Sequence, residues 1–103
     1  MPTFEIKDVY SKDCSCVEWV KAQKGIKRSM GDAYEWDTPY DKPFVGAVVV
    51  TRESDLGHVG IVTDVNLDEG YIVISEKNYA PCTVTHGRKL PINSPLIEGY
   101  WYE

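Results

Sequence analysis

Long apolar runs, an excess of positive charge and an even set of cysteines are all absent from this 103-residue sequence. No stretch approaches the roughly 20 apolar residues of a membrane-spanning helix, so we expect no transmembrane segment. The opening MPTFEIKDVYSKDC is mixed and charged, and we expect no signal peptide and synthesis in the cytoplasm. Eleven basic against 16 acidic residues give a net charge of −5, which argues against a nucleic-acid partner.

Only three cysteines and two histidines are available for thiol or metal chemistry. The odd cysteine count does not form a disulfide framework, and it leaves at least one thiol free. A soft-metal site would have to use Cys14, Cys16, Cys82 and His58. The Cys-x-Cys spacing is not that of a zinc knuckle, and no second cysteine pair faces it, so a metal site is disfavoured.

A single helix is predicted near the start of the chain, over about residues 15–24. Ser15 and Glu18 have the Ser-x-x-Glu spacing of a capping box, and Gly25 follows the last helical residues as a stop. Trp19 and Val20 supply an apolar face that can lie on a sheet.

The rest of the chain predicts β-strands. Residues 26–43 form a connector that we expect to be partly helical and to pack through Tyr34 and Trp36. The β-branched runs VGAVVVT, HVGIVTDV and YIVISE then alternate with turn-rich loops, and two weaker strands follow around CTVTHGRKLPI and LIEGYWYE. The sequence therefore predicts one α+β domain over residues 1–103, with the helix on one face of an antiparallel sheet of about five strands.

Of the two cysteines at the helix start, Cys16 is the better nucleophile. With Ser15 as the N-cap, Cys16 is the first helical residue, where unpaired backbone N–H groups and the helix dipole stabilise a thiolate. Its neighbours three and four positions later are the apolar Trp19 and Val20. For Cys14 one of those positions is Glu18, whose carboxylate would then point at the core.

A base and an orienting acid are predicted on adjacent strands. His58 opens the strand of LGHVGIVTDV, and Gly60 leaves space two residues along on the same face. Glu76 ends the next strand, and an antiparallel pairing brings these two ends side by side, where the carboxylate can hold the imidazole. His86, in TVTHGRK, is expected to be a solvated histidine in a polar turn.

These motifs together resemble the cysteine/histidine-dependent amidohydrolase/peptidase (CHAP) family. The resemblance runs over nearly the whole sequence from Asp13 and is carried in order by CVEWV, GDAYEW, VGAVVV, GHVGIVTDV and VISEKNY. The tail VTHGRKLPINSPLIEGYWY is similar to the terminal strands of small, phage-borne members. The DCS at 13–15 also resembles sister NlpC-type peptidases, in which Cys14 would be catalytic. Those peptidases usually carry a second histidine where this chain has Glu76.

The resemblance implies a papain-like fold and hydrolysis of peptidoglycan, at the muramoyl–alanine amide or within the peptide stem and bridge. It implies that Cys16 is the nucleophile, His58 the general base and Glu76 the orienting acid, with Asn78 a supporting polar group for the imidazole or the oxyanion. Some members bind calcium through an aspartate-rich loop before the cysteine. Here only Asp8 and Asp13 are present, at unconvincing spacing, so we expect no required metal and no cofactor.

The predicted function is therefore a cysteine amidase or endopeptidase acting on the cell wall through a thioester. Two alternatives stay open: a non-catalytic virion or binding module on the same fold, and a thiol hydrolase acting on a non-wall amide. We expect synthesis in a bacterial cytoplasm, with release by lysis machinery as for an endolysin, or delivery in a bacteriophage particle. Affinity for intact cells is expected to depend on a wall-binding or virion partner protein.

Overall fold

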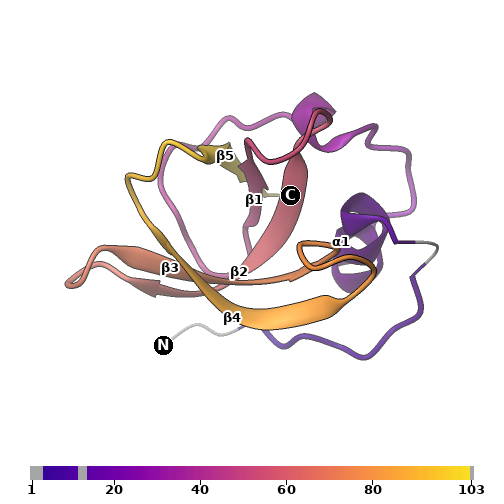
Figure 1. Ribbon diagram of the computed structural model, residues 1–103, viewed down its shortest axis with the longest axis horizontal. Helices are drawn as coiled ribbons and strands as arrows, with labels where there is room; N and C mark the ends of the chain where they lie inside the picture. The colour runs from indigo at the N-terminus through magenta and orange to yellow at the C-terminus, as the bar shows by residue number, and fades with distance from the viewer. Residues whose placement is uncertain (1–3, 12–13, 103) are drawn as a thin grey trace.

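One helix lies against a five-stranded antiparallel sheet in the computed structural model, which describes residues 4–11 and 14–102 (Figure 1). The elements are α1 (Cys16–Lys24), a 3-10 turn η1 (Ala33–Glu35), and the strands β1 (Val48–Thr51), β2 (His58–Asn66), β3 (Tyr71–Lys77), β4 (Val84–Pro91) and β5 (Ile97–Trp101). The strand order is β4-β3-β2-β1-β5, and α1 packs on β2 and β3. The predicted α+β class is confirmed.

Helix α1 begins and ends where its capping residues predict. The Ser15 hydroxyl accepts a hydrogen bond from the backbone N–H of Glu18 at 3.1 Å, and Gly25 ends the helix in the left-handed region at φ 70°. Trp19 and Val20 are 2% and 0% exposed, so they fix which face of α1 meets the sheet. Across residues 4–11 and 14–102, no helix has the length and apolar character needed to cross a membrane.

The apolar side chains divide between the two faces of the sheet. One cluster lies under α1 and contains Trp19, Val20, Ile26, Ala33, Trp36, Val48, Val50, Val59, Ile61 and Trp101. The other contains Ala47, Val49, Val62, Ile72, Ile74, Leu90 and Tyr100. Because neighbouring strand residues point to opposite faces, the run Ala47–Thr51 feeds both clusters and is almost wholly buried. Each such valine contributes roughly 1.5–3 kcal/mol by its burial.

The connector before the sheet packs mainly through one of its two predicted aromatic residues. Trp36 is 3% exposed and meets the ring of Trp101 edge to face, with 5.1 Å between ring centroids. Tyr34 remains 44% exposed, with its ring against the backbone of Gly57. Tyr34 therefore covers the loop that precedes β2 instead of entering the core.

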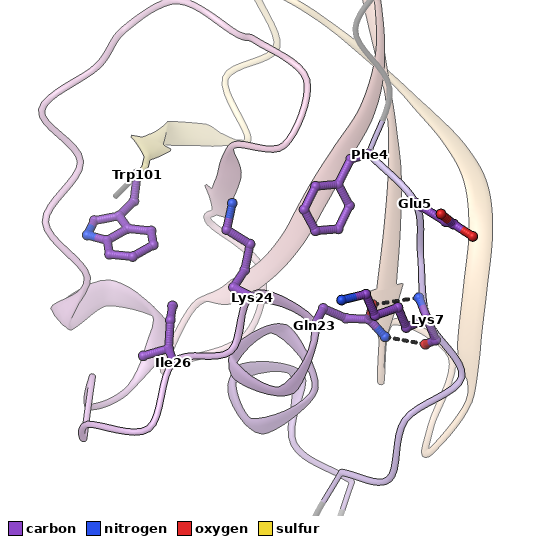
Figure 2. Close-up of a pocket in the computed structure, with 7 residues that line it drawn as sticks. All are labelled: Phe4, Glu5, Lys7, Gln23, Lys24, Ile26 and Trp101. Atoms are coloured by element: carbon purple, nitrogen blue, oxygen red, sulfur yellow. Dashed lines mark hydrogen bonds between the residues drawn. The ribbon is translucent and has the colours of Figure 1, made fainter.

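The N-terminal segment is tied to the C-terminal half of α1 (Figure 2). The buried Gln23 side chain accepts a hydrogen bond from the Lys7 backbone N–H at 2.8 Å and donates one to the Lys7 carbonyl at 2.5 Å. Lys24 lies over the ring of Phe4, 5.1 Å from its centroid. A pocket of about 360 Å³ opens between these residues and Trp101. It lies at the opposite end of α1 from Cys16.

A disulfide joins Cys14 to Cys82, and this corrects the expectation that the cysteines form no disulfide framework. Cys16 is the free thiol. The bond connects the residue before the Ser15 cap of α1 to the loop between β3 and β4, across a sequence separation of 68 residues. The odd count correctly left one thiol free, but the count could not exclude a bond between the other two cysteines.

We predict that the double variant Cys14→Ser/Cys82→Ser is less stable than the wild type by up to about 4 kcal/mol. Closing a loop of this length removes that much conformational freedom from the unfolded chain in the chain-entropy description. Urea titration gives the free energy of unfolding, and wild-type protein treated with a thiol reductant should match the double variant. Cys16→Ser keeps the bond and is the control. An unchanged unfolding midpoint in the double variant would contradict the prediction.

Candidate active site

Cys16 places a thiol where α1 begins, beside the start of β2. Hydrogen bonds reach the sulfur from the His58 imidazole and from the backbone N–H groups of Val59 and Val17. Burial raises the pKa of the Cys16 thiol, but these hydrogen bonds and the charge of the imidazole outweigh it, so the pKa falls below its ordinary value. Cys16 is therefore equipped to exist as a thiolate.

His58 is the first residue of β2 and links the thiol to a carboxylate. Its Nε2 lies 2.9 Å from Glu76 Oε1, so Nδ1 is the ring nitrogen left to face Cys16. Burial lowers the pKa of the His58 imidazole, but the hydrogen bonds to Cys16 and Glu76 have a larger, opposite effect and raise the pKa to about 9. The imidazole therefore carries a proton at neutral pH, paired with a thiolate on one side and a carboxylate on the other.

Glu76 is fully buried, with 0% of its surface exposed. Ile61 pairs with Ser75 across β2 and β3, and continuing this register places Glu76 opposite Gly60, diagonal to His58. A Cβ on Gly60 would lie 3.3 Å from the Glu76 Cβ and 3.1 Å from the Ser75 carbonyl. The space that Gly60 was predicted to leave is thus filled by Glu76, which leans along the strand to the imidazole.

Arg88, which the sequence analysis did not single out, also binds Glu76. From β4, its Nε lies 3.2 Å and 3.1 Å from the two Glu76 oxygens, and its Nη2 lies 2.7 Å from Oε1. The outer edge of the guanidinium binds Glu53 at 2.8 Å and 3.1 Å. Burial raises the pKa of the Glu53 carboxyl, but the hydrogen bonds from Arg88 and Thr51 lower it below its ordinary value.

Ordinary alternation with the buried Leu90 places Arg88 on the Glu76 face of the sheet, and a bulge in β4 turns His86 to the opposite face. Ile74 pairs with Arg88, and Glu76 pairs with Thr85. Between these two pairs β4 therefore contains one residue more than β3, which is a bulge. Gly87 lies in the bulge with φ 82°, a conformation that glycine adopts without strain. A glycine inside a β-branched run is a sequence signal for a bulge, and a buried glutamate requires a cation, but neither signal names Arg88.

The structure places the remaining predicted residues as follows. Asn78 lines the same pocket as Cys16 and His58, in the left-handed region at φ 69°, and its Oδ1 accepts a hydrogen bond from the Cys82 N–H at 2.8 Å. It holds the turn after β3, and its role toward the imidazole or an oxyanion stays a prediction. His86 is exposed as expected, but it lies within β4, not in a turn, with Nδ1 2.9 Å from the Ser75 hydroxyl.

The disulfide removes two of the four candidate ligands for a soft metal ion. Cys14 and Cys82 are bonded to each other and offer no thiolate ligands. Within residues 4–11 and 14–102, no group of three or more His, Cys, Asp or Glu side chains could hold a metal ion. Asp13, one of the two aspartates before the cysteine, lies outside the described residues. The absence of a required metal stays a prediction.

The thiol and the imidazole open into a pocket of about 290 Å³. Its lining is Cys16, Glu53, Ser54, Gly57, His58, Asn78 and Tyr79. Tyr79 is 53% exposed at the rim, and its ring stacks on the Arg88 guanidinium at 3.9 Å. The sulfur of the partly exposed Cys16 therefore lies at the wall of a pocket that opens to solvent.

A cysteine at a helix start, beside a histidine that opens an antiparallel strand and is held by a carboxylate, is the arrangement that papain-like thiol hydrolases use. The family model of the CHAP domain matches residues 6–78, and the chain belongs to the CHAP domain family. CHAP domains are generally hydrolases of the amidase or peptidase type, and the observed α+β arrangement is consistent with their papain-like fold. A comparison with curated proteins finds no match.

We predict that Cys16 is alkylated by iodoacetamide at pH 6–7 at least about tenfold faster than an unperturbed thiol. The lowered pKa leaves more of the sulfur as thiolate at that pH. His58→Gln should move the rise in rate to higher pH, because the imidazolium no longer stabilises the anion. Mass spectrometry should find one modified site, and Cys16→Ala should show none. A wild-type rate equal to that of a free thiol would contradict this reading of the site.

We predict that Gly60→Ala separates Glu76 from His58. The added methyl group would press on the Ser75 carbonyl and the Glu76 Cβ, so the strands or the carboxylate must shift, at a cost of about 1–3 kcal/mol in stability. The alkylation rate of Cys16 at pH 6 should fall with it. Asp64→Ala, at an exposed position on the same strand, is the control. Unchanged stability and reactivity in Gly60→Ala would show that the close packing is not required.

Proposed function

We propose that this protein is a peptidoglycan hydrolase that cleaves an amide bond through a thioester on Cys16. The observation that carries the proposal is the unbroken chain of contacts from Cys16 through His58 to Glu76, with the sulfur at the wall of an open pocket. Membership of the CHAP family supports an amidase or peptidase activity on the cell wall. The bond itself, at the muramoyl–alanine amide or within the peptide stem and bridge, is left for experiment.

The reaction begins from the thiolate–imidazolium pair. The Cys16 sulfur attacks the amide carbonyl carbon, and the C=O pair moves onto oxygen to give a tetrahedral anion. The anion then collapses, the C–N bond breaks, and His58 gives its proton to the leaving amine. The neutral imidazole takes a proton from water, whose oxygen attacks the thioester and releases the acid. The sulfur leaves as thiolate, and His58 is again imidazolium.

The start of α1 supplies the donors for the tetrahedral anion. The N–H of Glu18 is used by the Ser15 hydroxyl, and that of Val17 is directed at the Cys16 sulfur. The N–H of Cys16 itself is then the first-turn donor nearest the reacting carbon, as proposed here. Asn78, in the same pocket, is proposed as a supporting polar group.

The disulfide supports action outside the cytoplasm. Bonds such as Cys14–Cys82 persist in oxidising surroundings and are rare where cellular thiols keep cysteines reduced. We propose that the bond forms after the protein leaves the cytoplasm, by lysis-dependent release or in a phage particle. A wall-binding or virion partner protein is proposed to bring the enzyme to intact cells.

The experiment follows the turbidity of purified cell walls and the mass of released muropeptides. Wild type should clear the suspension and create new carboxyl and amino ends, whereas Cys16→Ala and His58→Gln should lose at least about a thousandfold in rate. His86→Gln removes the other histidine, outside the pocket, and should keep the activity. The fragment masses identify the bond.

Three outcomes would overturn the proposal. Equal clearing by wild type and Cys16→Ala would remove the mechanism. A wild type with a fast-reacting thiol that releases no fragments would leave a thiol hydrolase of another amide. A wild type with neither activity nor an activated thiol would be a binding or virion module on the CHAP fold.

A further inference from the structure

We propose that Arg88 is a positioning residue of this site, which acts by holding Glu76 against His58 as a charged, correctly directed carboxylate. The proposal rests on the proposed function only in treating the site as catalytic. The contacts of Arg88 and the measurement of thiol reactivity do not depend on that function. Arg88 lies on β4, beyond the residues 6–78 that the family model matches.

The geometry shows a guanidinium shared between two carboxylates. Nε and Nη2 of Arg88 face both oxygens of Glu76, while Nη1 and Nη2 face both oxygens of Glu53, with all contacts between 2.7 and 3.2 Å. This is the fork geometry that arginine offers and lysine does not. Glu76 Oε1 receives Nη2 of Arg88 and Nε2 of His58 together. The orientation of the imidazole is thereby linked to that of the guanidinium.

Burial makes the arginine necessary. Glu76 is 0% exposed and the Arg88 side chain 14% exposed, so water provides little compensation for the carboxylate. Removing one partner of a buried charged pair leaves the other uncompensated, and that is costly. The charged and titratable groups around Glu76 are Cys16 from α1, His58 from β2, Arg88 from β4 and, beyond Arg88, Glu53 from the loop before β2. Arg88 is the fixed positive charge among them.

Two further contacts keep Arg88 in place. Tyr79 stacks on the guanidinium at 3.9 Å, and the Thr51 hydroxyl donates to Glu53 Oε1 at 2.7 Å. These contacts fix the orientation of Glu53 and Arg88 independently of Glu76. A side chain that only filled space would not need a guanidinium hydrogen-bonded to a carboxylate on each of two edges.

The test is the pH profile of Cys16 alkylation by iodoacetamide on the full chain. His58 is protonated below about pH 9, so the acid side of the profile reports formation of the thiolate beside an imidazolium. Arg88→Gln removes a positive charge and should move this limb to higher pH by about one unit, which lowers the rate at pH 6 about tenfold. Arg88→Lys keeps the charge and should restore most of the limb. Wall-cleaving kcat should stay below wild type in Arg88→Lys, because an ammonium cannot hold both carboxylates.

A variant of opposite sign separates electrostatics from general damage. Glu53→Gln removes a negative charge near the site and leaves Arg88 on Glu76, so its limb should move to lower pH. Arg52→Gln is the matched control, since this exposed arginine binds Glu98 and the backbone around residue 97 instead of Glu76. Its profile should equal that of the wild type. Circular dichroism and urea titration check that each variant is folded.

A folded Arg88→Gln variant whose alkylation profile has the same acid limb as the wild type would overturn the proposal. If Arg88→Gln does not fold, Glu53→Gln decides: a limb at lower pH supports the proposal, and an unmoved or higher limb overturns it. The alkylation profiles are measured without cell walls. A shifted limb in a protein that cleaves no wall would therefore refute the proposed function alone, and wall cleavage with an unmoved limb would refute the positioning role alone.

Discussion

The buried carboxylate of Glu76 is the interaction on which this site depends. Its Oε1 is hydrogen-bonded both to the imidazole of His58 and to the guanidinium of Arg88. An isolated charge at 0% exposure would be unfavourable, so the fold must bring it donors from the strands on either side. β2 supplies His58 and β4 supplies Arg88, because these two strands flank β3 in the order β4-β3-β2. The thiol of Cys16 is then activated at the far side of the imidazole.

The positions of Cys16, His58 and Glu76 can largely be predicted from local sequence signals. Ser15 and Gly25 set the ends of α1, and the apolar pair Trp19 and Val20 sets its rotation, which together fix where Cys16 lies. Both signals act within one or two helical turns and need no knowledge of the rest of the chain. The pairing of His58 with Glu76 follows from two strands joined by a short loop, where register is limited to a few choices. Side-chain placement could therefore be predicted for these residues.

The parts that escaped prediction depend on long-range or irregular geometry. The bond between Cys14 and Cys82 joins positions 68 residues apart, and a cysteine count carries no information on which thiols meet. Arg88 shares a face with Leu90 by simple alternation, but its partner Glu76 lies on another strand, and the bulge at Gly87 that turns His86 to the opposite face is a step that simple alternation does not include. The prediction that His86 lies in a turn is wrong because the glycine beside it forms a bulge within β4. Glycine in HGRK interrupts a strand here without ending it.

The two unpredicted features share a location and a consequence. Cys82 and Arg88 both follow residue 78, where the family match ends, and both connect back to the site that precedes it. The disulfide joins the loop that carries Asn78 and Tyr79 to Cys14, two residues before α1, while Arg88 binds the carboxylate that holds His58. The thiol and the imidazole are thus contributed by the matched segment, but the groups that hold them in place come from the loop and strand beyond it. The site is therefore a property of the whole sheet, since a helix and a hairpin alone would hold a thiol and an imidazole near each other without fixing the charge that orients them.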